Sequence, residues 1–167
     1  MSILTRATRP FDMTYLRRWL NDPRTLPYLP VSQEDEVEQM IGSWAFFARY
    51  QAGITAILHH VPCGMATLLL MPYKKTQHQC TFYVCVDPAY RKQGIGTRLI
   101  EQLMHLAKEQ FHIEGVYIDV FGNNPLLSIL PRQGFISCIT QKQYIKTDQG
   151  YEDRTVWIRA LDGQEWL

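Results

Sequence analysis

One junction near the middle of the chain constrains its fold more than any other feature, because a buried strand passes there directly into a helix. The run CTFYVCV, residues 80–86, is apolar at nearly every position, which is typical of a strand covered on both faces. Residues 95–111 carry apolar side chains at helical spacing on one side and polar side chains on the other. Gly115 then opens a second apolar run, VYIDVF. Two strands joined through a helix are predicted to lie parallel, with a right-handed crossover.

Shorter patterns on either side of this unit predict the rest of the fold. The other predicted elements are an edge strand at 2–7, a helix at 12–23, a helix capped by Ser32 and Asp35 that runs to about residue 50, a hairpin turning at residues 62–64, a short helix interrupted by Pro131, and a final hairpin around TDQG. The predicted fold class is α/β with a mixed sheet of about seven strands. The sheet is mostly antiparallel around a central parallel pair, the fourth and fifth strands, and helices cover both faces.

Length, charge and cysteine usage narrow the class of protein. The length of 167 residues favours one domain, spanning residues 1–167. The formal net charge of +1 argues against a nucleic-acid-coating protein. The four cysteines show neither CxxC pairing nor zinc spacing, so they are expected to be reduced, buried thiols. No secretory signal follows Met1, and the apolar run MATLLLM is too short to span a bilayer. We therefore expect a cytoplasmic protein with no metal and no nucleic-acid or membrane partner.

The junction itself, VDPAYRKQGIGTRL, predicts a ligand site. The first turn of a helix presents unpaired backbone N–H groups and a partial positive charge. Gly94 and Gly96 leave room for a ligand to approach that backbone, and Arg91 and Lys92 add full positive charge. Together these features predict a phosphate or diphosphate site. The alternative is a glycine-relaxed turn with solvated cations. The chain has no GxxxxGK motif, and Leu99 stands where a dinucleotide-binding fingerprint requires a third glycine.

The stretch YVCVDPAYRKQGIGTRLIEQLMHLA resembles the acetyl-coenzyme A motif of the GNAT superfamily of N-acetyltransferases. The core pattern of that motif, R/Q-x-x-G-x-G/A, is met by Arg91, Gly94 and Gly96. An apolar strand, an asparagine and a short helix ending in Gly-Phe follow in the expected order, so the motif extends over 80–135. The likeness is closest to the ribosomal-protein-alanine acetyltransferases. It implies that residues 80–161 form the cofactor-binding half of the domain and residues 1–60 the acceptor-side half.

The resemblance also implies where acetyl-coenzyme A binds as the cosubstrate. The diphosphate would rest on the backbone amides of residues 92–97, and the pantetheine arm would lie between the splayed fourth and fifth strands. An asparagine after the fifth strand commonly reaches this arm, and two adjacent asparagines compete for that role here. Either asparagine has an alternative use as an Asx-type cap of the short helix. The implied cofactor-binding residues are Val84, Val86, Arg91, Lys92, Gln93, Gly94, Ile95, Gly96, Thr97, Asn123 and Asn124.

An amine must lose a proton before it attacks a thioester, so a general base is expected near the acetyl group. Asp119 interrupts the apolar run VYIDVF, where burial would raise its pKa and suit it to take protons near neutrality. The ribosomal-protein-alanine acetyltransferases carry a carboxylate at the matching place, and a purely structural role is the alternative. Leu130 stands where many members place the tyrosine that protonates the leaving thiolate. Tyr83 is the predicted substitute, with Tyr117, Tyr144 or water as alternatives.

Three functions are compatible with these patterns. The first is an N-acetyltransferase that moves an acetyl group from acetyl-coenzyme A to a primary amine of a small molecule, peptide or protein by direct attack. The second is a non-catalytic module that binds coenzyme A as a sensor or interaction partner, which the missing tyrosine keeps open. The third is a phosphate-binding α/β enzyme of another kind. A monomer or a homodimer is expected.

Overall fold

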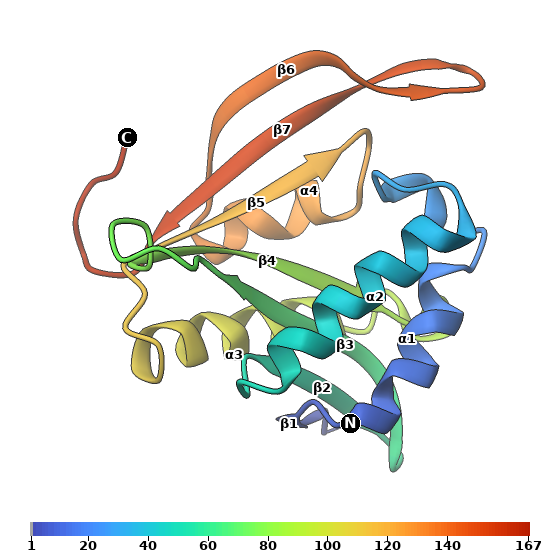
Figure 1. Ribbon diagram of the computed structural model, residues 1–167, viewed down its shortest axis with the longest axis horizontal. Helices are drawn as coiled ribbons and strands as arrows, with labels where there is room; N and C mark the ends of the chain where they lie inside the picture. The colour runs from blue at the N-terminus through green and yellow to red at the C-terminus, as the bar shows by residue number, and fades with distance from the viewer. Residues whose placement is uncertain (1) are drawn as a thin grey trace.

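Seven strands form one sheet that runs through the protein (Figure 1). The computed structural model describes residues 2–167. The strands are β1 (Leu4–Ala7), β2 (Gly53–Leu58), β3 (Val61–Leu70), β4 (Gln79–Val86), β5 (Gly115–Phe121), β6 (Ile136–Thr147) and β7 (Gly150–Ala160). Their order across the sheet is β1-β2-β3-β4-β5-β7-β6, and among these neighbours β4 and β5 alone pair in parallel. The predicted mixed sheet with a central parallel pair is confirmed.

Helices cover both faces of this sheet, as the apolar periodicities predict. They are α1 (Met13–Leu20), α2 (Glu34–Ala48), α3 (Ile95–Glu109) and α4 (Leu126–Ile129), together with the 3-10 turns η1 (Pro10–Asp12), η2 (Leu26–Tyr28), η3 (Pro88–Tyr90) and η4 (Leu130–Gln133). In Figure 1, α1 and α2 lie on one side of the sheet and α3 lies on the other. Among the helices of residues 2–167, none is both long and apolar enough to cross a lipid bilayer.

Two apolar cores hold these layers together. On the α3 side, Leu99 and Leu103 are fully buried in one cluster with Phe82 of β4. On the other side, Trp44 of α2 belongs to a second cluster that includes Met65 of β3. Burying a leucine side chain completely stabilises a fold by about 1.5–3 kcal/mol. The apolar stripe of α3 therefore holds the start of this helix firmly beside the end of β4.

The β2–β3 hairpin turns earlier than predicted. His59 and His60 form the turn, with φ of 50° and 65°, whereas residues 62–64 lie inside β3. A two-residue turn with both residues left-handed matches the right-handed twist of the flanking strands, and this match outweighs the Pro-Cys-Gly signal. Pro62 pairs with Ile57 at a shift in register, where a missing backbone N–H is tolerated.

The cap of α2 is of the predicted kind but shifted by one residue. Gln33 is the N-cap, one residue after the predicted Ser32. The Glu36 carboxylate, rather than that of Asp35, accepts the backbone N–H groups of Ser32 and Gln33 at 2.8 and 2.9 Å. A capping box needs its acidic residue three positions after the N-cap, and Glu36 is the residue at that position.

Asp12, at the end of η1, is a buried charge that joins the start of α1 to the sheet. Its carboxylate accepts two hydrogen bonds from the Arg6 guanidinium, at 2.6 and 2.8 Å. It also accepts the Arg9 backbone N–H at 2.8 Å and the Thr55 hydroxyl at 2.9 Å. Burial opposes the charged form, but these bonds outweigh it and hold the pKa of the Asp12 carboxyl below its usual value. The position of α1 relative to β1 and β2 therefore depends on an ionised Asp12.

Candidate active site

The candidate site lies where β4 and β5 part. The two strands pair only from Gln79 with Gly115 to Thr81 with Tyr117. Beyond that point β4 continues to pair with β3, and β5 with β7. The edges that β4 and β5 turn toward each other therefore lose their partners, and Figure 1 shows the two strands diverging. The result is a fork in the middle of the sheet.

Peptide groups of β4 line one side of this fork. The Asp87 N–H, directly after β4, donates to the Cys63 carbonyl of β3 at 2.9 Å. Backbone groups of an antiparallel strand alternate sides residue by residue, so the peptide groups of Tyr83 also face β3. Those of Val84 and Val86 face the fork, where no strand lies opposite them. This edge can donate hydrogen bonds to, and accept them from, an extended ligand that lies between the strands.

The loop that follows β4 has the backbone geometry of an anion site. Lys92 and Gly94 are both left-handed, with φ of 61° and 80°. Left-handed residues that alternate with ordinary ones turn successive N–H groups to the same side and form an anion-binding concavity. The first intrahelical bond of α3 is made by the Arg98 N–H to the Gly94 carbonyl, at 3.0 Å. The N–H groups of residues 95–97 precede this bond and have no partner within the helix.

The two motif glycines differ in what surrounds them. Gly94 is the N-cap of α3, and a Cβ built on it would meet no atom within 4 Å. A Cβ on Gly96 would lie 3.5 Å from Ile129 Cδ1 and 3.6 Å from Val86 Cγ2, which are ordinary contacts. The space opened by a missing side chain is therefore beside Gly94. An alanine at Gly96 fits against its protein neighbours, and the prediction that Gly96 lets a ligand approach the backbone stays a prediction.

The Arg91 side chain departs most clearly from the predicted site. It was expected beside the phosphates, but its guanidinium turns toward the segment between α1 and α2. Nη1 donates to the Arg24 carbonyl at 2.7 Å, and Nη2 donates to the Thr25 hydroxyl at 2.6 Å. Lys92 and Gln93 remain exposed in the loop. The cation whose side chain is exposed beside the anion-site backbone is therefore Lys92.

The residues that follow β5 divide into a cap, an exposed amide and a core side chain. Asn124 Oδ1 accepts the Leu126 N–H at 2.9 Å, so Asn124 caps α4, which is the alternative role considered for it. Asn123 is exposed, and its side chain takes no part in that cap. Leu130 is completely buried in the core on the α3 side. The place where a proton-donating tyrosine was expected is thus a packing position in this chain.

Tyr83 of β4 and Asp119 of β5 lie on opposite sides of the fork and on the same face of the sheet. Tyr83 stacks on Trp44 of α2, with ring centroids 5.9 Å apart. Burial, and then the nearby charge of Asp119, raise the pKa of the Tyr83 phenol. The neighbours of Asp119, Ile118 and Val120, are buried in the α3-side core. Since side chains alternate along a strand, Asp119 points to the other face, where α1 and α2 lie.

Asp119 is not buried, contrary to the prediction. Its side chain is 40% exposed and forms an ion pair with Arg154 of β7. Arg154 Nε and Nη2 both donate to Asp119 Oδ1, at 3.0 and 2.8 Å, and no group of residues 2–167 is bonded to Oδ2. The apolar run around Asp119 was misleading, because the core covers only the face of β5 that carries Ile118 and Val120. The structure supplies a carboxylate held in place by an arginine, with one oxygen free.

Arg154 belongs to a cluster that the sequence did not reveal. Its Nη1 donates to Gln141 Oε1 of β6 at 2.6 Å, and its guanidinium carbon lies 5.0 Å from the ring centroid of Tyr144. Tyr144 in turn stacks on Phe121 of β5, with ring centroids 6.0 Å apart. The period-two pattern of YEDRTVW indicates which side chains of β7 share a face with Arg154. The partners of Arg154 on β5 and β6 follow only from the strand pairing. Tyr117 lies outside this cluster, at the base of the fork, with its ring 6.4 Å from that of Trp166.

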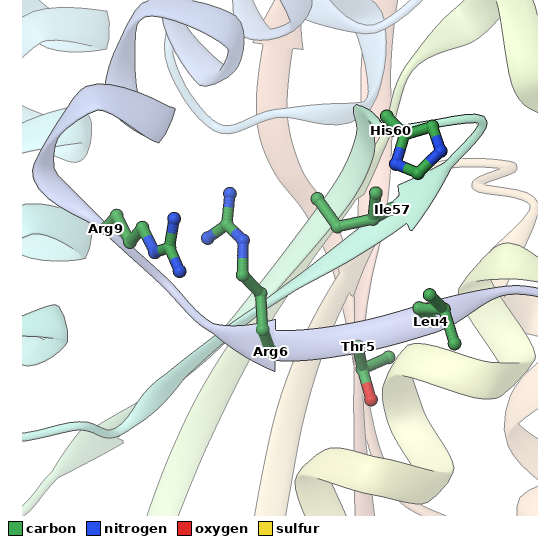
Figure 2. Close-up of a pocket in the computed structure, with 6 residues that line it drawn as sticks. All are labelled: Leu4, Thr5, Arg6, Arg9, Ile57 and His60. Atoms are coloured by element: carbon green, nitrogen blue, oxygen red, sulfur yellow. The ribbon is translucent and has the colours of Figure 1, made fainter.

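A separate hollow of about 440 Å³ lies at the β1 edge of the sheet (Figure 2). Arg6, which lines this hollow, already forms an ion pair with the buried Asp12. β3 and β4 separate this edge from β5, and none of the predicted site residues lines the hollow. The residues that line it are Leu4, Thr5, Arg6, Arg9, Ile57 and His60. The fork therefore remains the candidate active site.

A sheet that forks between its parallel strands, and a loop with left-handed residues that leads from β4 into α3, agree with the fold that the GNAT motif led us to expect. The chain belongs to the acetyltransferase (GNAT) family, whose profile matches residues 7–135. It is 21% identical over 98 residues to the L-amino acid N-acetyltransferase AaaT of Escherichia coli (strain K12). That match covers 58% of this chain and 60% of the relative, so less than two thirds of the relative's length is spanned.

Solved structures of similar fold include two whose descriptions concern acetyl transfer. One is yncA from Salmonella typhimurium with its cofactor acetyl-CoA, with a TM-score of 0.81, 15% identity, and coverage of 100% of this chain and 98% of that chain. The other is a ribosomal-protein-alanine N-acetyltransferase from Brucella melitensis, with a TM-score of 0.77, 21% identity, and coverage of 95% and 99%. At sequence identities of 15% and 21%, the similarity to these structures establishes the fold alone.

Proposed function

We propose that this protein is an N-acetyltransferase that moves the acetyl group of acetyl-coenzyme A to a primary amine by direct attack. The observation that carries the proposal is the fork between β4 and β5, whose unpaired β4 edge ends at the anion-site loop. Tyr83 and Asp119 lie across that fork on one face of the sheet. Membership of the GNAT family supports the same reaction class, as does a neighbour of the same fold that holds acetyl-CoA.

The groups of this chain fit acetyl-coenzyme A in three places. The backbone N–H groups of residues 92–97, with Lys92 exposed beside them, suit its diphosphate. The fork-facing peptide groups of Val84 and the N–H of Val86 suit the amides of its pantetheine arm, whereas the Val86 carbonyl accepts a hydrogen bond from Arg91. Asn123 has an uncommitted side-chain amide after β5 and is the asparagine left to reach that arm, because Asn124 caps α4. The bound thioester supplies an activated acetyl group to the face that carries Tyr83 and Asp119.

Protons are transferred by the two side chains that lie on the same face of the sheet, one on each side of the fork. Asp119 Oδ2 accepts the proton that the attacking amine must lose, directly or through a water molecule. The Val84 N–H donates to the carbonyl oxygen on which negative charge develops as the nitrogen–carbon bond forms. The carbon–sulfur bond then breaks, and the thiolate takes a proton from the Tyr83 phenol or from water. A tyrosine phenol is protonated at neutral pH, as a proton donor must be, and the raised pKa of Tyr83 does not change this.

The charges at the fork support one class of acceptor. Asp119 offers a free carboxylate oxygen to an ammonium group, and Arg154 beside it is 25% exposed. A molecule with an ammonium and a carboxylate close together complements this pair, and the relative AaaT is named for L-amino acids. L-amino acids are therefore the first acceptors to test, followed by peptide N-termini and lysine side chains.

The test is acetylated product, measured by mass spectrometry after incubation with acetyl-coenzyme A and a panel of these amines. We expect product and an equal amount of free coenzyme A with at least one acceptor. Asp119→Asn should lower kcat at neutral pH by about 100-fold, within the usual contribution of a general base, and leave the Kd for coenzyme A unchanged. Asp153→Asn is the matched control, since Asp153 pairs with Lys142 away from the fork. Wild-type kcat in Asp119→Asn would remove Asp119 from the reaction.

A second candidate function is a coenzyme A-binding module without transferase activity. The observation in its favour is the complete burial of Leu130, which leaves the usual proton-donor position apolar. Tyr83→Phe separates the two functions, because it keeps the ring stacked on Trp44 and removes only the hydroxyl. Loss of kcat in this variant supports an enzyme that uses Tyr83 as the acid. Tight coenzyme A binding with no product from any amine supports the binding module.

A further inference from the structure

We infer that Arg91 is a positioning residue that fastens the segment between α1 and α2 to the diphosphate loop, so that bound coenzyme A orders this acceptor-side segment. The inference rests on the proposed function, because it concerns how the two substrates of that reaction are brought together. The motif arginine would then act on the acceptor side of the enzyme and not as a phosphate ligand.

The contacts of Arg91 carry the inference. Its Nη1 and Nη2 reach the Arg24 carbonyl and the Thr25 hydroxyl, 67 and 66 residues away in the chain, at 2.7 and 2.6 Å. Its Nε also donates to the Val86 carbonyl at the end of β4, at 3.4 Å. Thr25 is only 5% exposed, so the bond to its hydroxyl is shielded from water. Charge-assisted bonds of this kind are about twice as strong as neutral ones.

The segment that Arg91 holds is braced internally. The Asp22 carbonyl accepts the N–H groups of Thr25 and Leu26 at 2.8 and 3.0 Å, and the Asp22 carboxylate binds Arg24 at 2.8 Å. Fixing Arg24 and Thr25 therefore fixes the whole turn from residue 22 to residue 26. A second, longer contact joins the same parts of the fold, because Arg18 of α1 lies 3.8 Å from Asp87, directly after β4.

Coupling to coenzyme A arises from the neighbour of Arg91. Lys92 is left-handed with φ 61°, a conformation that costs free energy for a residue with a side chain. A diphosphate bound to the adjacent N–H groups holds this conformation in place and reduces the motion of the backbone that carries Arg91. Ordering one end of a hydrogen-bonded bridge lowers the entropic cost of ordering the other end. Leu26 of this turn packs against the core cluster that contains Trp44, and Trp44 stacks on Tyr83, so these contacts connect the turn to the acceptor face.

The experiment is hydrogen–deuterium exchange of the full chain, with and without coenzyme A, together with calorimetric affinity for coenzyme A. In the wild type, coenzyme A should slow exchange both in residues 91–98 and in residues 22–29. In Arg91→Met, protection of residues 91–98 should persist and protection of residues 22–29 should disappear. Coenzyme A affinity should fall by no more than about fivefold, as expected for a cation that does not touch the phosphates. Arg91→Lys, which can keep one of the two bonds, should restore part of the protection.

Thr25→Val tests the same bridge from its other end and leaves the motif intact. It keeps the shape of the buried side chain and removes one of the two acceptors that this segment offers to Arg91, so protection of residues 22–29 by coenzyme A should fall between that of the wild type and that of Arg91→Met. Arg49→Met is the control, because it removes a cation at the far end of α2 and should behave as wild type. Two outcomes overturn the inference alone: coenzyme A binds the wild type without protecting residues 22–29, or Arg91→Met weakens coenzyme A binding by more than tenfold. A wild-type chain that binds no coenzyme A overturns the proposed function and the inference together.

Discussion

Alanine at Gly94 and alanine at Gly96 should have opposite effects, although the two positions are separated by a single residue. Gly94 is left-handed with φ 80°, and a residue with a Cβ costs about 1–2 kcal/mol more than glycine in that conformation. Gly96 lies in the first turn of α3, where its Cβ would make ordinary contacts at 3.5 and 3.6 Å. Alanine is preferred to glycine in a helix by up to about 1 kcal/mol.

These differences convert into measurable shifts. In a chain of this size, 1 kcal/mol changes Tm by roughly 2–4 °C, so Gly94→Ala should lower Tm by about 2–8 °C and Gly96→Ala should raise it slightly. If the loop of Gly94→Ala must regain its left-handed geometry to hold a diphosphate, coenzyme A affinity falls about 5- to 30-fold. Gly94→Glu adds a negative charge in the open space beside the phosphates. Repulsion between this carboxylate and each phosphate charge at about 5–8 Å weakens binding by a further 2–3 kcal/mol or so, and coenzyme A binding should be lost.

Thermal unfolding by circular dichroism and calorimetric titration with coenzyme A measure both effects in the same preparations. Gly96→Ala is the internal control, since it adds the same methyl group two residues away. The reasoning fails if Gly96→Ala loses coenzyme A binding while Gly94→Ala keeps it. Such a result would mean that the ligand approaches the helix from the side of Val86 and Ile129, and that the open space beside Gly94 is not the phosphate site.

Three further predictions concern groups outside the fork. The folded-state pKa of Asp12 is lowered, so its stabilising contribution is present above the unfolded carboxyl pKa of about 4 and is lost as pH falls through the folded value. Stability should therefore fall less steeply with acid in Asp12→Asn than in the wild type, and an unchanged acid transition would contradict this. Burial raises the pKa of the Cys63 thiol to about 11 and those of Cys80 and Cys85 to about 12. A thiol reagent should therefore label the half-buried Cys138 first in the native protein, and all four cysteines only after unfolding. Leu130→Ala should lower the free energy of unfolding by about 2–5 kcal/mol in urea titrations, and a loss below 1 kcal/mol or so would mean that Leu130 is not a core residue.

Most features encoded by neighbouring residues were predicted correctly, although the turn between β2 and β3 and the N-cap of α2 were misplaced. The apolar run 80–86, the amphipathic segment after it and the glycines between them determine a buried strand, a helix and a helix start with free N–H groups. Each of these depends on periodicity or on the backbone freedom of residues close in the chain. The order of elements and the parallel pair followed from them through the handedness of the crossover. The family could be recognised from the same short stretch.

The tertiary structure decided which side chains meet across the sheet. Asp119 was expected to be buried because its sequence neighbours are apolar, but only one face of β5 is covered, and the partner of Asp119 comes from β7, 35 residues away. Arg91 was assigned to phosphate binding because it precedes the glycine-containing loop in the sequence. The fold instead brings Arg24 and Thr25 to it from the first quarter of the chain. Such partners depend on strand register and on the packing of distant segments, which local periodicity does not encode. Local sequence thus determined the backbone that can hold a diphosphate, and long-range packing determined how the charged side chains around it are used.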